Sequence, residues 1–448
     1  MATPPSKYLG NLVDIDRGEI SREIFVSGEI YQHEQEQVFA RAWLFIGHES
    51  QIPKPGDYFV SRMGEESVIL TRDRDGIIHV FLNSCRHRGM KVCRYDEGNT
   101  PVFSCPYHGW SYATDGKLVG VPYFKQAYHD ELDKSKWGLV EVPQMANYKG
   151  TIWATWDAGA PPLEEYLGDV KTYLDVFLDN LDGTPSELEV IGGVQKWTMP
   201  NNWKWASENF SGDNYHGISH RSVDMLKISP SGALGRHQFD AVRTPSTNLS
   251  VSHRGHGWRA QLKQSDDYQP AYGDDPVIDG YFREAHRRRI KNLGEMSRLK
   301  SSGGTVFPNV SFSDGRMSIG VWHPAGPHHT EAWRWYFIWK DAPQEVRDIW
   351  RPYVMRYAGP SGMTEQDDME NWNYAHASSM GTIARRHPYN YKMGLGHEAT
   401  KGDEDWIVKG GLVTQQTLTE QNQRGMYELW ASLMDAKDWG AVRSSPQW

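Results

Sequence analysis

Two short loops, each containing one cysteine and one histidine, place the tightest constraint on how this chain folds. The first contains Cys85 and His87, and after seventeen further residues the second contains Cys105 and His108. Thiolates and imidazoles are metal ligands, but four of them hold a metal centre only if the two loops come together. The pattern therefore favours two neighbouring β-hairpins that each present one loop.

A [2Fe–2S] cluster suits these loops better than a zinc ion does. Both cysteines can bind one iron and both histidines the other, which is the Rieske arrangement, and the two imidazoles raise the reduction potential. Structural zinc uses the same ligand types, but its signatures usually pair Cys with Cys and His with His. Each loop here is mixed, and Gly89 and Gly109 supply the turns that a bulky cluster needs. Cys93 lies outside the pattern and is expected to be a buried or spare thiol.

A second group of polar residues recurs at helical intervals between Trp203 and His220. Asn209, Asp213, His216 and His220 are spaced four, three and four residues apart, so a helix would place them on one face. A polar stripe on a helix is usually solvated. The segment WKWASENFSGDNYHGISH is too aromatic for a simple exposed face, which favours polar groups that converge on something buried.

Two histidines four residues apart on a helix suit a divalent metal ion. The peptidase version of this motif has Glu directly after the first His, whereas this chain has Gly217. Two His and one carboxylate can bind iron(II) and leave positions open for oxygen. Asp213 is close in sequence, but three ligands from one short helix would crowd the metal, so we expect it to orient an imidazole. The best distant ligand is Asp368, expected with Asp367 in the first turn of a helix that Thr364 caps.

Composition and charge exclude several classes of function. The 448 residues suffice for two or three domains, and 48 basic against 57 acidic residues give a formal charge of −9. This balance argues against nucleic acid or an anionic membrane as the main partner. The first residues, MATPPSKYLG, do not resemble a signal peptide, and no run approaches the roughly 18 apolar residues of a spanning helix. Three cysteines make no disulfide framework, so we expect a soluble, cytoplasmic protein.

The sequence predicts an α+β protein in three parts. Residues 1–38 form an arm and an amphipathic helix, expected over 21–43, that packs with the catalytic domain. Residues 39–157 form an antiparallel β domain, because short β-branched and aromatic runs alternate with turn signals at Asp75-Gly76 and Asp115-Gly116. Residues 158–448 form an α+β catalytic domain, in which helices cover an antiparallel sheet.

The sequence predicts local structure in two further segments. Asp314-Gly315 predicts a hairpin between the runs VFPNVSFS and RMSIGVWHP. The basic run at 286–289 is most simply a solvated helix face, with docking to an acidic or phosphate-bearing partner as the less favoured reading.

Together these motifs resemble the large, catalytic α subunit of Rieske non-haem iron aromatic-ring-hydroxylating dioxygenases of the naphthalene and biphenyl type. The resemblance covers nearly the whole chain, through ARAWLFIGHESQIPKPGDY, CRHRG, CPYHGW, ENFSGDNYH, VFPN, VWHPAGP and GPSGMTEQDDMENW. It implies cluster ligands at Cys85, His87, Cys105 and His108. It implies mononuclear iron ligands at His216, His220 and Asp368.

The resemblance also implies an assembly and redox partners. In the family, three α subunits form a ring, with small β subunits completing an α3β3 hexamer, and the cluster of one subunit faces the mononuclear iron of the next. Asp213 would then connect His216 of its own chain to His108 of the partner subunit. Electrons from NADH would arrive through a reductase and a ferredoxin. With O2, the iron would convert an aromatic substrate into a cis-dihydrodiol.

Two alternative functions stay open from the sequence. Related families use the same ligands for monohydroxylation or demethylation, and an electron carrier would leave the His216 site empty. One departure from the resemblance concerns spacing, because relatives usually place four or more residues between the two iron histidines, whereas three separate His216 and His220. The shape of the pocket near Gly217 and Ser219 is expected to differ accordingly.

The substrate pocket is expected to include residues near the iron ligands. Asn209 and Phe210 precede them on the helix, and Phe307 and Asn309 belong to the VFPN segment. For the aromatic residues a position in the core is an equally good interpretation.

Overall fold

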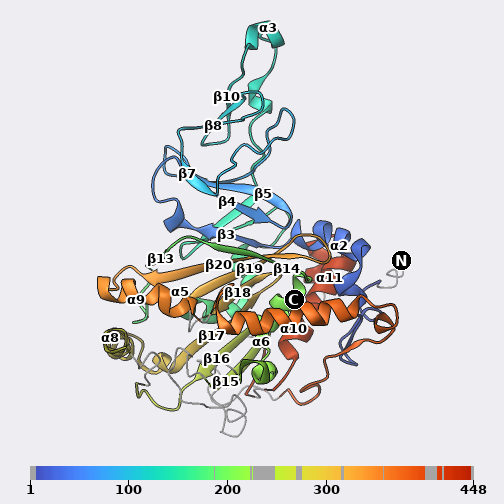
Figure 1. Ribbon diagram of the computed structural model, residues 1–448, viewed down its shortest axis with the longest axis vertical. Coiled ribbons are helices and arrows are strands. Elements are labelled where there is room, and N and C mark those ends of the chain that lie inside the picture. The colour runs from blue at the N-terminus through green and yellow to red at the C-terminus, as the bar shows by residue number, and fades with distance from the viewer. Residues whose placement is uncertain are drawn as a thin grey trace. The chain divides into compact units, whose positions relative to one another are not determined.

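The computed structural model describes residues 7–185, 187–221, 225, 248–268, 275–313, 317–356, 358–398, 411–415 and 418–444. The chain forms two compact units (Figure 1). Phe39–Ala160 is one unit, and Met1–Val38 together with Pro161–Trp448 is the other. The boundary predicted at residue 157 lies in the same Gly- and Pro-containing stretch as the end of the first unit.

The Phe39–Ala160 unit consists mainly of antiparallel β-structure, as predicted. Its three sheets have the strand orders β6-β5-β4-β7, β10-β9-β8 and β11-β12-β3. The strands are β3 (Leu44–His48), β4 (Asp57–Met63), β5 (Glu66–Arg72), β6 (Ile78–Leu82), β7 (Glu97–Asn99), β8 (Val102–Ser104), β9 (Ser111–Ala113), β10 (Leu118–Gly120), β11 (Gln144–Tyr148) and β12 (Thr151–Thr155). A short helix, α3 (Phe124–Tyr128), follows β10.

Both Asp-Gly turns predicted in this unit are confirmed. Asp75-Gly76 connects β5 to β6, and Asp115-Gly116 connects β9 to β10. Gly76 and Gly116 have φ angles of 85° and 82°, which residues with a side chain rarely adopt. A Cβ atom at Gly116 would also lie 2.6 Å from the ring of Phe81, so only glycine fits this turn.

The larger unit is built on a nine-stranded antiparallel sheet, which confirms the predicted α+β class. The strand order is β13-β20-β19-β18-β17-β16-β15-β22, and β14 also pairs with β20. These strands are β13 (Leu188–Val190), β14 (Gln195–Met199), β15 (Asn248–His253), β16 (His256–Leu262), β17 (Leu299–Val306), β18 (Val310–Ser313), β19 (Ser318–Pro324), β20 (Thr330–Trp339) and β22 (Leu412–Thr414). β18 and β19 form the predicted hairpin, although its turn at 314–316 lies outside the described residues.

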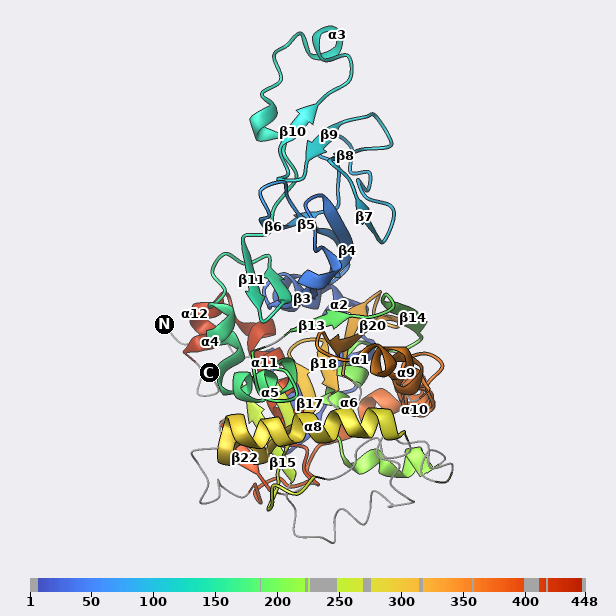
Figure 2. The ribbon, with the colours of Figure 1, turned by 90° about the vertical axis from the view of Figure 1, so that its left-hand side faces the viewer.

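Helices pack against this sheet. α6 contacts β16, β17 and β18, and α11 contacts α6, β15 and β16, so these two helices share one face. α8 packs beside α9 (Figure 2). The helices are α4 (Leu163–Leu167), α5 (Lys171–Leu178), α6 (Lys204–Gly212), α8 (Pro276–Leu293), α9 (Gln344–Met355), α10 (Met363–Ser379), α11 (Gln421–Asp435) and α12 (Trp439–Arg443).

The N-terminal segment is part of the larger unit, but the single helix predicted for it is wrong. α1 (Glu23–Val26) and α2 (Gly28–Glu34) are separate, because Ser27 is extended and its hydroxyl caps α2 by accepting the N–H of Ile30. A π-helical turn, Gln35–Phe39, follows. β1 (Val13–Asp14) and β2 (Glu19–Ile20) form a small sheet with β21 (Tyr389–Asn390).

A fully buried ion pair connects α2, in the N-terminal segment, with α6, and its carboxylate also binds α11. Glu34 pairs with Lys204 of α6 and accepts the indole N–H groups of Trp203 and Trp430. Both charged side chains are fully buried, and these hydrogen bonds offset the cost of removing them from water.

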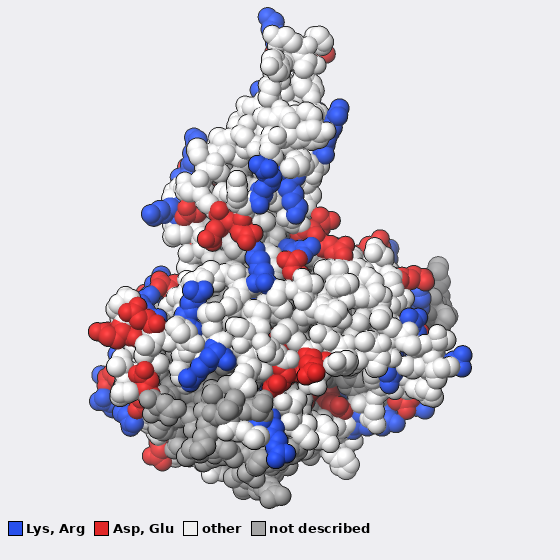
Figure 3. Space-filling model, in the orientation of Figure 1, with Lys and Arg blue, Asp and Glu red and all other residues white. Residues whose placement is uncertain are grey.

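The basic run on α8 is largely engaged within the fold. Arg289 is buried and donates to the carbonyls of Ser297 and Leu299. Arg288 pairs with Asp182 and Asp341. These contacts favour a structural role over docking. On the described surface drawn in Figure 3, basic and acidic side chains are interspersed in both units.

Among the described helices, none has both the length and the apolar character that crossing a membrane requires.

Candidate metal centres

The two Cys/His loops have the same backbone geometry. In each, the cysteine N–H donates to the carbonyl five residues further on, and the N–H of the glycine four residues on donates back to the cysteine carbonyl. These bonds are 2.8 and 2.9 Å long both at Cys85 and at Cys105. Gly89 and Gly109, with φ angles of 73° and 74°, make the turns possible. The predicted role of the two glycines in turning the loops is confirmed.

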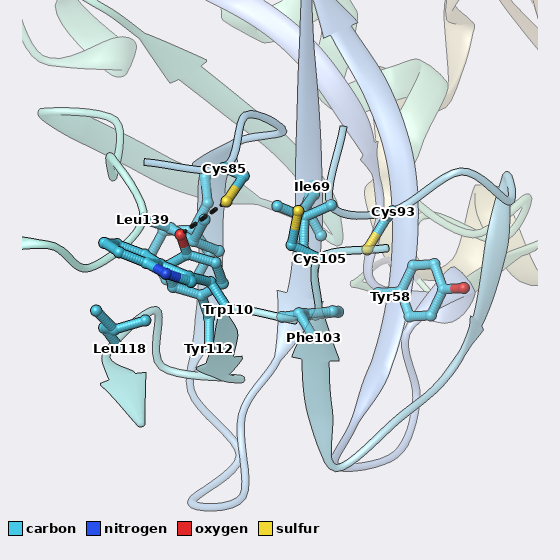
Figure 4. Packing of buried hydrophobic residues seen from close by; sticks show 12 residues of the cluster. Tyr58, Ile69, Cys85, Cys93, Phe103, Cys105, Trp110, Tyr112, Leu118 and Leu139 are labelled. Carbon is cyan, nitrogen blue, oxygen red and sulfur yellow. Dashed lines mark hydrogen bonds between the residues drawn. The ribbon is translucent and has the colours of Figure 1, made fainter. Parts of the chain in front are cut away.

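The ligand atoms of the two loops face one another in pairs. His87 Nδ1 and His108 Nδ1 lie 3.1 Å apart. Cys85 and Cys105 are each only 3% exposed and lie in the apolar cluster drawn in Figure 4. The indole of Trp110 stacks on the His87 ring at 5.1 Å and 10°, which holds that imidazole in place. Burial and the neighbouring charges of His108 and Arg88 lower the pKa of His87, which favours the neutral imidazole that a metal requires.

This donor set fits a two-iron cluster rather than a single ion. In the described part of the chain, no three of these four Cys and His residues have ligand atoms that all lie within 4.8 Å of one another. The four ligands of one tetrahedral zinc ion would be that close, since each lies about 2.0–2.3 Å from the metal. Two paired sets that do not converge on one point match a cluster in which each iron takes one pair.

The third cysteine is separate from this site. Cys93 is 8% exposed, and burial raises the pKa of its thiol to about 12. It therefore stays a neutral thiol, as expected of a residue outside the ligand pattern.

The second site lies beyond the end of α6, and the single helical face predicted for it is wrong. α6 stops at Gly212, Asp213 is extended, and a 3-10 turn runs from Tyr215 to His220. Asn422 of α11 helps to end α6 at this point. Its side-chain amide donates to the Ser211 carbonyl and leaves no room for a side chain at position 212. The last turn of α6 thus finds hydrogen-bond partners outside its own helix.

The structure nevertheless brings the three predicted iron ligands together. Asp368 Oδ1 lies 3.5 Å from His216 Nε2 and 3.2 Å from His220 Nε2. The two imidazole centroids are 5.0 Å apart. His216, His220 and Asp368 are the group whose ligand atoms all lie within 4.8 Å of one another. Their side chains are 22%, 8% and 7% exposed, so the site is mostly buried.

An iron ion fits this donor set. Asp368 Oδ1 is buried and accepts no hydrogen bond from any described residue, although two imidazole nitrogens face it. A buried carboxylate oxygen without such a bond is costly, and a bound cation would satisfy it. Two neutral nitrogens and one carboxylate are the ligands of non-haem iron(II) oxygenases.

α10 supplies the carboxylate of this site. Its first residue is Met363 and its N-cap is Gly362, so Thr364 is not the cap and Asp367 and Asp368 lie in the second turn. The prediction was wrong here because the Gly residue before the helix takes the extended cap conformation without a side-chain bond.

A buried ion pair anchors the start of α10 to the sheet. Glu365 pairs with Arg334 of β20, and both side chains are fully buried. Glu365 also accepts the N–H of Gly359 at 3.2 Å. The position of Asp368 relative to the two histidines therefore depends on this anchor.

Asp213 contacts the first histidine of the site. Its Oδ2 is 3.2 Å from His216 Nδ1, and its Oδ1 accepts the N–H groups of Tyr215 and His216. Burial raises the pKa of Asp213, but the contacts with His216 and the two backbone groups outweigh it and lower the pKa overall. The side chain keeps 31% exposure, so it can reach a group outside its own chain.

The four predicted pocket residues lie in two segments, two on α6 and two between β17 and β18. Asn209 is partly exposed near the end of α6, and Phe210 is buried against Trp322. Phe307 and Asn309 belong to the connection between β17 and β18 and are buried. The backbone N–H of Phe307 donates to a histidine ring, and the Asn309 amide donates to the Trp322 carbonyl, so both contribute to the core. Their role in binding substrate stays a prediction.

Several contacts of the sites had no signal in the sequence. The Tyr112 hydroxyl lies 3.2 Å from Cys85 Sγ, and Asp367 Oδ2 lies 3.3 Å from His220 Nδ1. Tyr112 follows the CPYHGW segment closely, but its partner is on the other loop. Only the packing of the two loops and of α10 creates these pairs.

Comparison with known proteins agrees with this geometry. A family model described as the Rieske [2Fe-2S] domain matches residues 42–145, and one described as the ring hydroxylating alpha subunit (catalytic domain) matches residues 167–435. The biphenyl dioxygenase subunit alpha of Paraburkholderia xenovorans is 37% identical, over 96% of this chain and 94% of the relative. The benzene 1,2-dioxygenase subunit alpha of Pseudomonas putida is also 37% identical, over 97% and 95%.

A solved structure shows the same fold. Naphthalene 1,2-dioxygenase with indole bound in the active site superposes with a TM-score of 0.87 and 31% identity, over 96% of this chain and 95% of that one. Fold and donor sets together define a Rieske-type non-haem iron oxygenase. Within that class, the chain belongs to the family of aromatic ring-hydroxylating dioxygenase α subunits. Its cofactors are a [2Fe–2S] cluster and a mononuclear iron, with O2 as co-substrate and NADH as the electron source through a reductase.

Proposed function

We infer that this chain is the terminal oxygenase subunit that dihydroxylates an aromatic ring with O2 to give a cis-dihydrodiol. The observation that carries this proposal is the group of His216, His220 and Asp368, in which a buried carboxylate oxygen faces two imidazole nitrogens. When bound there, iron(II) supplies the activation of O2.

The residues of the chain have separate tasks in this proposal. Cys85, Cys105, His87 and His108 hold the cluster that receives electrons. His216, His220 and Asp368 hold the mononuclear iron and leave positions open beside it. Asn209, Phe210, Phe307 and Asn309 are proposed to border the aromatic substrate.

Asp213 is proposed to connect the two centres across a subunit interface. Its contact with His216 and its partial exposure support this role, because the same carboxylate can accept a hydrogen bond from His108 of the partner subunit. We further propose an α3β3 hexamer with a small β subunit, and a ferredoxin as the electron donor. The support for these partners is that the relatives are named as alpha subunits.

Turnover with isotopically labelled O2 tests the proposal. The purified chain, supplied with a surrogate reductase and ferredoxin, is offered aromatic hydrocarbons and aromatic acids, and the products are identified by mass spectrometry. A cis-dihydrodiol with both labelled oxygen atoms supports the proposal. One labelled atom in a hydroxylated product would instead indicate monohydroxylation, and a demethylated product released together with labelled formaldehyde would indicate demethylation.

Metal analysis distinguishes the proposed dioxygenase from a protein that only carries electrons. A dioxygenase holds one iron per chain beyond the two of the cluster, and changing Asp368 to Ala removes that iron. A preparation that holds cluster iron alone, unaffected by this change, would contradict the proposal.

A further inference from the structure

His220 contacts a carboxylate at each of its two ring nitrogens. Its Nε2 lies 3.2 Å from Asp368, and its Nδ1 lies 3.3 Å from Asp367. We propose that Asp367 is a positioning residue, which fixes the ring and the tautomer of His220 so that Nε2 is directed to the mononuclear iron. This inference rests on the iron site of the proposed function, and nothing in the family resemblance assigned Asp367 a role.

One turn of α10 can supply both carboxylates because successive side chains on a helix point about 100° apart. Asp368 is 7% exposed and approaches the ring from the metal side. Asp367 is 25% exposed and approaches the opposite nitrogen. The ring between them is 8% exposed, so water competes little for either nitrogen.

The acceptor at Nδ1 decides where the imidazole proton lies. A neutral histidine carries one N–H, and a carboxylate beside Nδ1 keeps that hydrogen on Nδ1. Nε2 then has a free lone pair, and the carboxylate also makes it a stronger electron donor to a metal.

The two iron histidines are not supported equally within one chain. His220 Nδ1 makes a hydrogen-bonding contact with Asp367. His216 Nδ1 lies 3.2 Å from Asp213, yet it makes no aligned hydrogen bond with any described residue. Asp367 comes from a remote helix anchored by the Glu365–Arg334 pair, whereas Asp213 belongs to the same loop as His216. The carboxylate beside His220 Nδ1 thus comes from a separate, anchored helix, whereas the carboxylate beside His216 Nδ1 comes from its own loop.

The test compares Asp367→Ala and Asp367→Asn with wild type and with Glu370→Ala. Glu370 is an exposed carboxylate about one turn further along α10 and serves as the matched control. The release of mononuclear iron to a chelator and the spin-resonance signal of its nitric oxide adduct are measured. Cluster absorbance and cooperative thermal unfolding verify that each variant is folded.

The expected result is a loss of iron affinity of about 10- to 100-fold in Asp367→Ala, the range found when such supporting partners are removed. Asp367→Asn should lose less, because its amide oxygen still accepts the Nδ1 hydrogen, and Glu370→Ala should match wild type. The spin-resonance signal of the nitric oxide adduct should change more in Asp367→Ala than in Asp367→Asn, and it should not change in Glu370→Ala.

Wild-type iron affinity and an unchanged signal in Asp367→Ala would overturn the inference. If that variant does not fold, the same comparison is made with Asp367→Leu, which also lacks an acceptor for the Nδ1 hydrogen, and an unchanged release rate there has the same consequence. Wild-type protein that binds no mononuclear iron would instead contradict the proposed function.

Discussion

In the Rieske unit, Phe39–Ala160, the hydroxyl of Tyr112 on β9 contacts Cys85 and Arg86 of the first Cys/His loop. It lies 3.2 Å from Cys85 Sγ and accepts the backbone N–H of Arg86 at 3.0 Å. Because the oxygen already accepts one hydrogen, its own hydrogen is free to point at the sulfur. Tyr112 is fully buried, so no water replaces this bond (Figure 4).

We therefore predict that Tyr112→Phe lowers the reduction potential of the cluster. A hydrogen bond to sulfur stabilises the extra negative charge of the reduced state. A bond of about 1 kcal/mol corresponds to on the order of 40 mV for one electron, so a fall of that size is expected in a spectroscopic titration. Tyr107→Phe is the control, because this exposed ring stacks on His108 rather than on a sulfur. An unchanged potential in Tyr112→Phe would show that the hydroxyl points elsewhere.

Asp213 gives a prediction about electron transfer. Asp213→Ala should keep both metal centres but abolish turnover, because it removes the carboxylate that we propose links the centres. Metal content, cluster absorbance and product formation are measured on the same preparation. Asp213→Asn tests the negative charge alone. Its amide oxygen can still accept the N–H groups of Tyr215 and His216, so the loop is preserved. Full activity in both variants would exclude the connecting role.

Candidate ligands that lie close together along the chain could be predicted from the sequence. A cysteine and a histidine within one short loop identify a metal site without any knowledge of the fold, and the Asp-Gly turns locate the hairpins that carry the loops. The α+β class and the antiparallel sheets followed from the same local patterns.

The sequence could not reveal features that distant residues decide. The helix before the iron site ends at Gly212 because Asn422, from the far C-terminal helix, takes the carbonyl of Ser211. Asp367 and Asp368 look alike in sequence, and only the orientation of α10 directs one to Nδ1 and the other to Nε2 of His220. Such outcomes depend on packing between elements, which local patterns do not encode.

His79 makes the stability of the Rieske unit depend on pH. Its Nδ1 lies 2.7 Å from Glu141, and its Nε2 lies 3.1 Å from Asp73. Burial lowers the pKa of His79, but the hydrogen bonds to Glu141 and Asp73 outweigh it, so the pKa is raised overall. The folded state thus binds the proton more tightly than the unfolded state, whose pKa is about 6.5. This stabilisation is complete below about pH 6.5 and is lost as pH rises through the folded pKa.

The corresponding prediction uses His79→Gln. The variant should unfold at a lower temperature than wild type at pH 6, and the difference should shrink as the pH rises through the raised folded-state pKa of His79, above which His79 is neutral in both states. Calorimetric scans of the holoprotein at several pH values measure this. Glu141 is half exposed, so the expected effect at pH 6 is modest, about 1 kcal/mol. A difference that stays constant across pH would rule out the charged histidine as its source.

The buried pair of Arg334 and Glu365 gives the last prediction. Changing Glu365 to Ala leaves a guanidinium that is fully buried without its charge partner, which costs about 3–5 kcal/mol. Because Glu365 precedes Asp368 by less than one turn of α10, the mononuclear iron should also bind less tightly, while the cluster in the other unit keeps its absorbance. Metal analysis and thermal unfolding separate the two effects.

A double variant distinguishes anchoring from simple destabilisation. Arg334→Met combined with Glu365→Leu removes both charges and restores apolar packing, which should recover much of the stability lost in Glu365→Ala. Iron affinity should recover with it if the pair only holds α10 in place. Recovery of stability without recovery of iron would mean that charge itself influences the iron site, as on the Arg334 guanidinium that lies over the rings of Phe210 and Trp322.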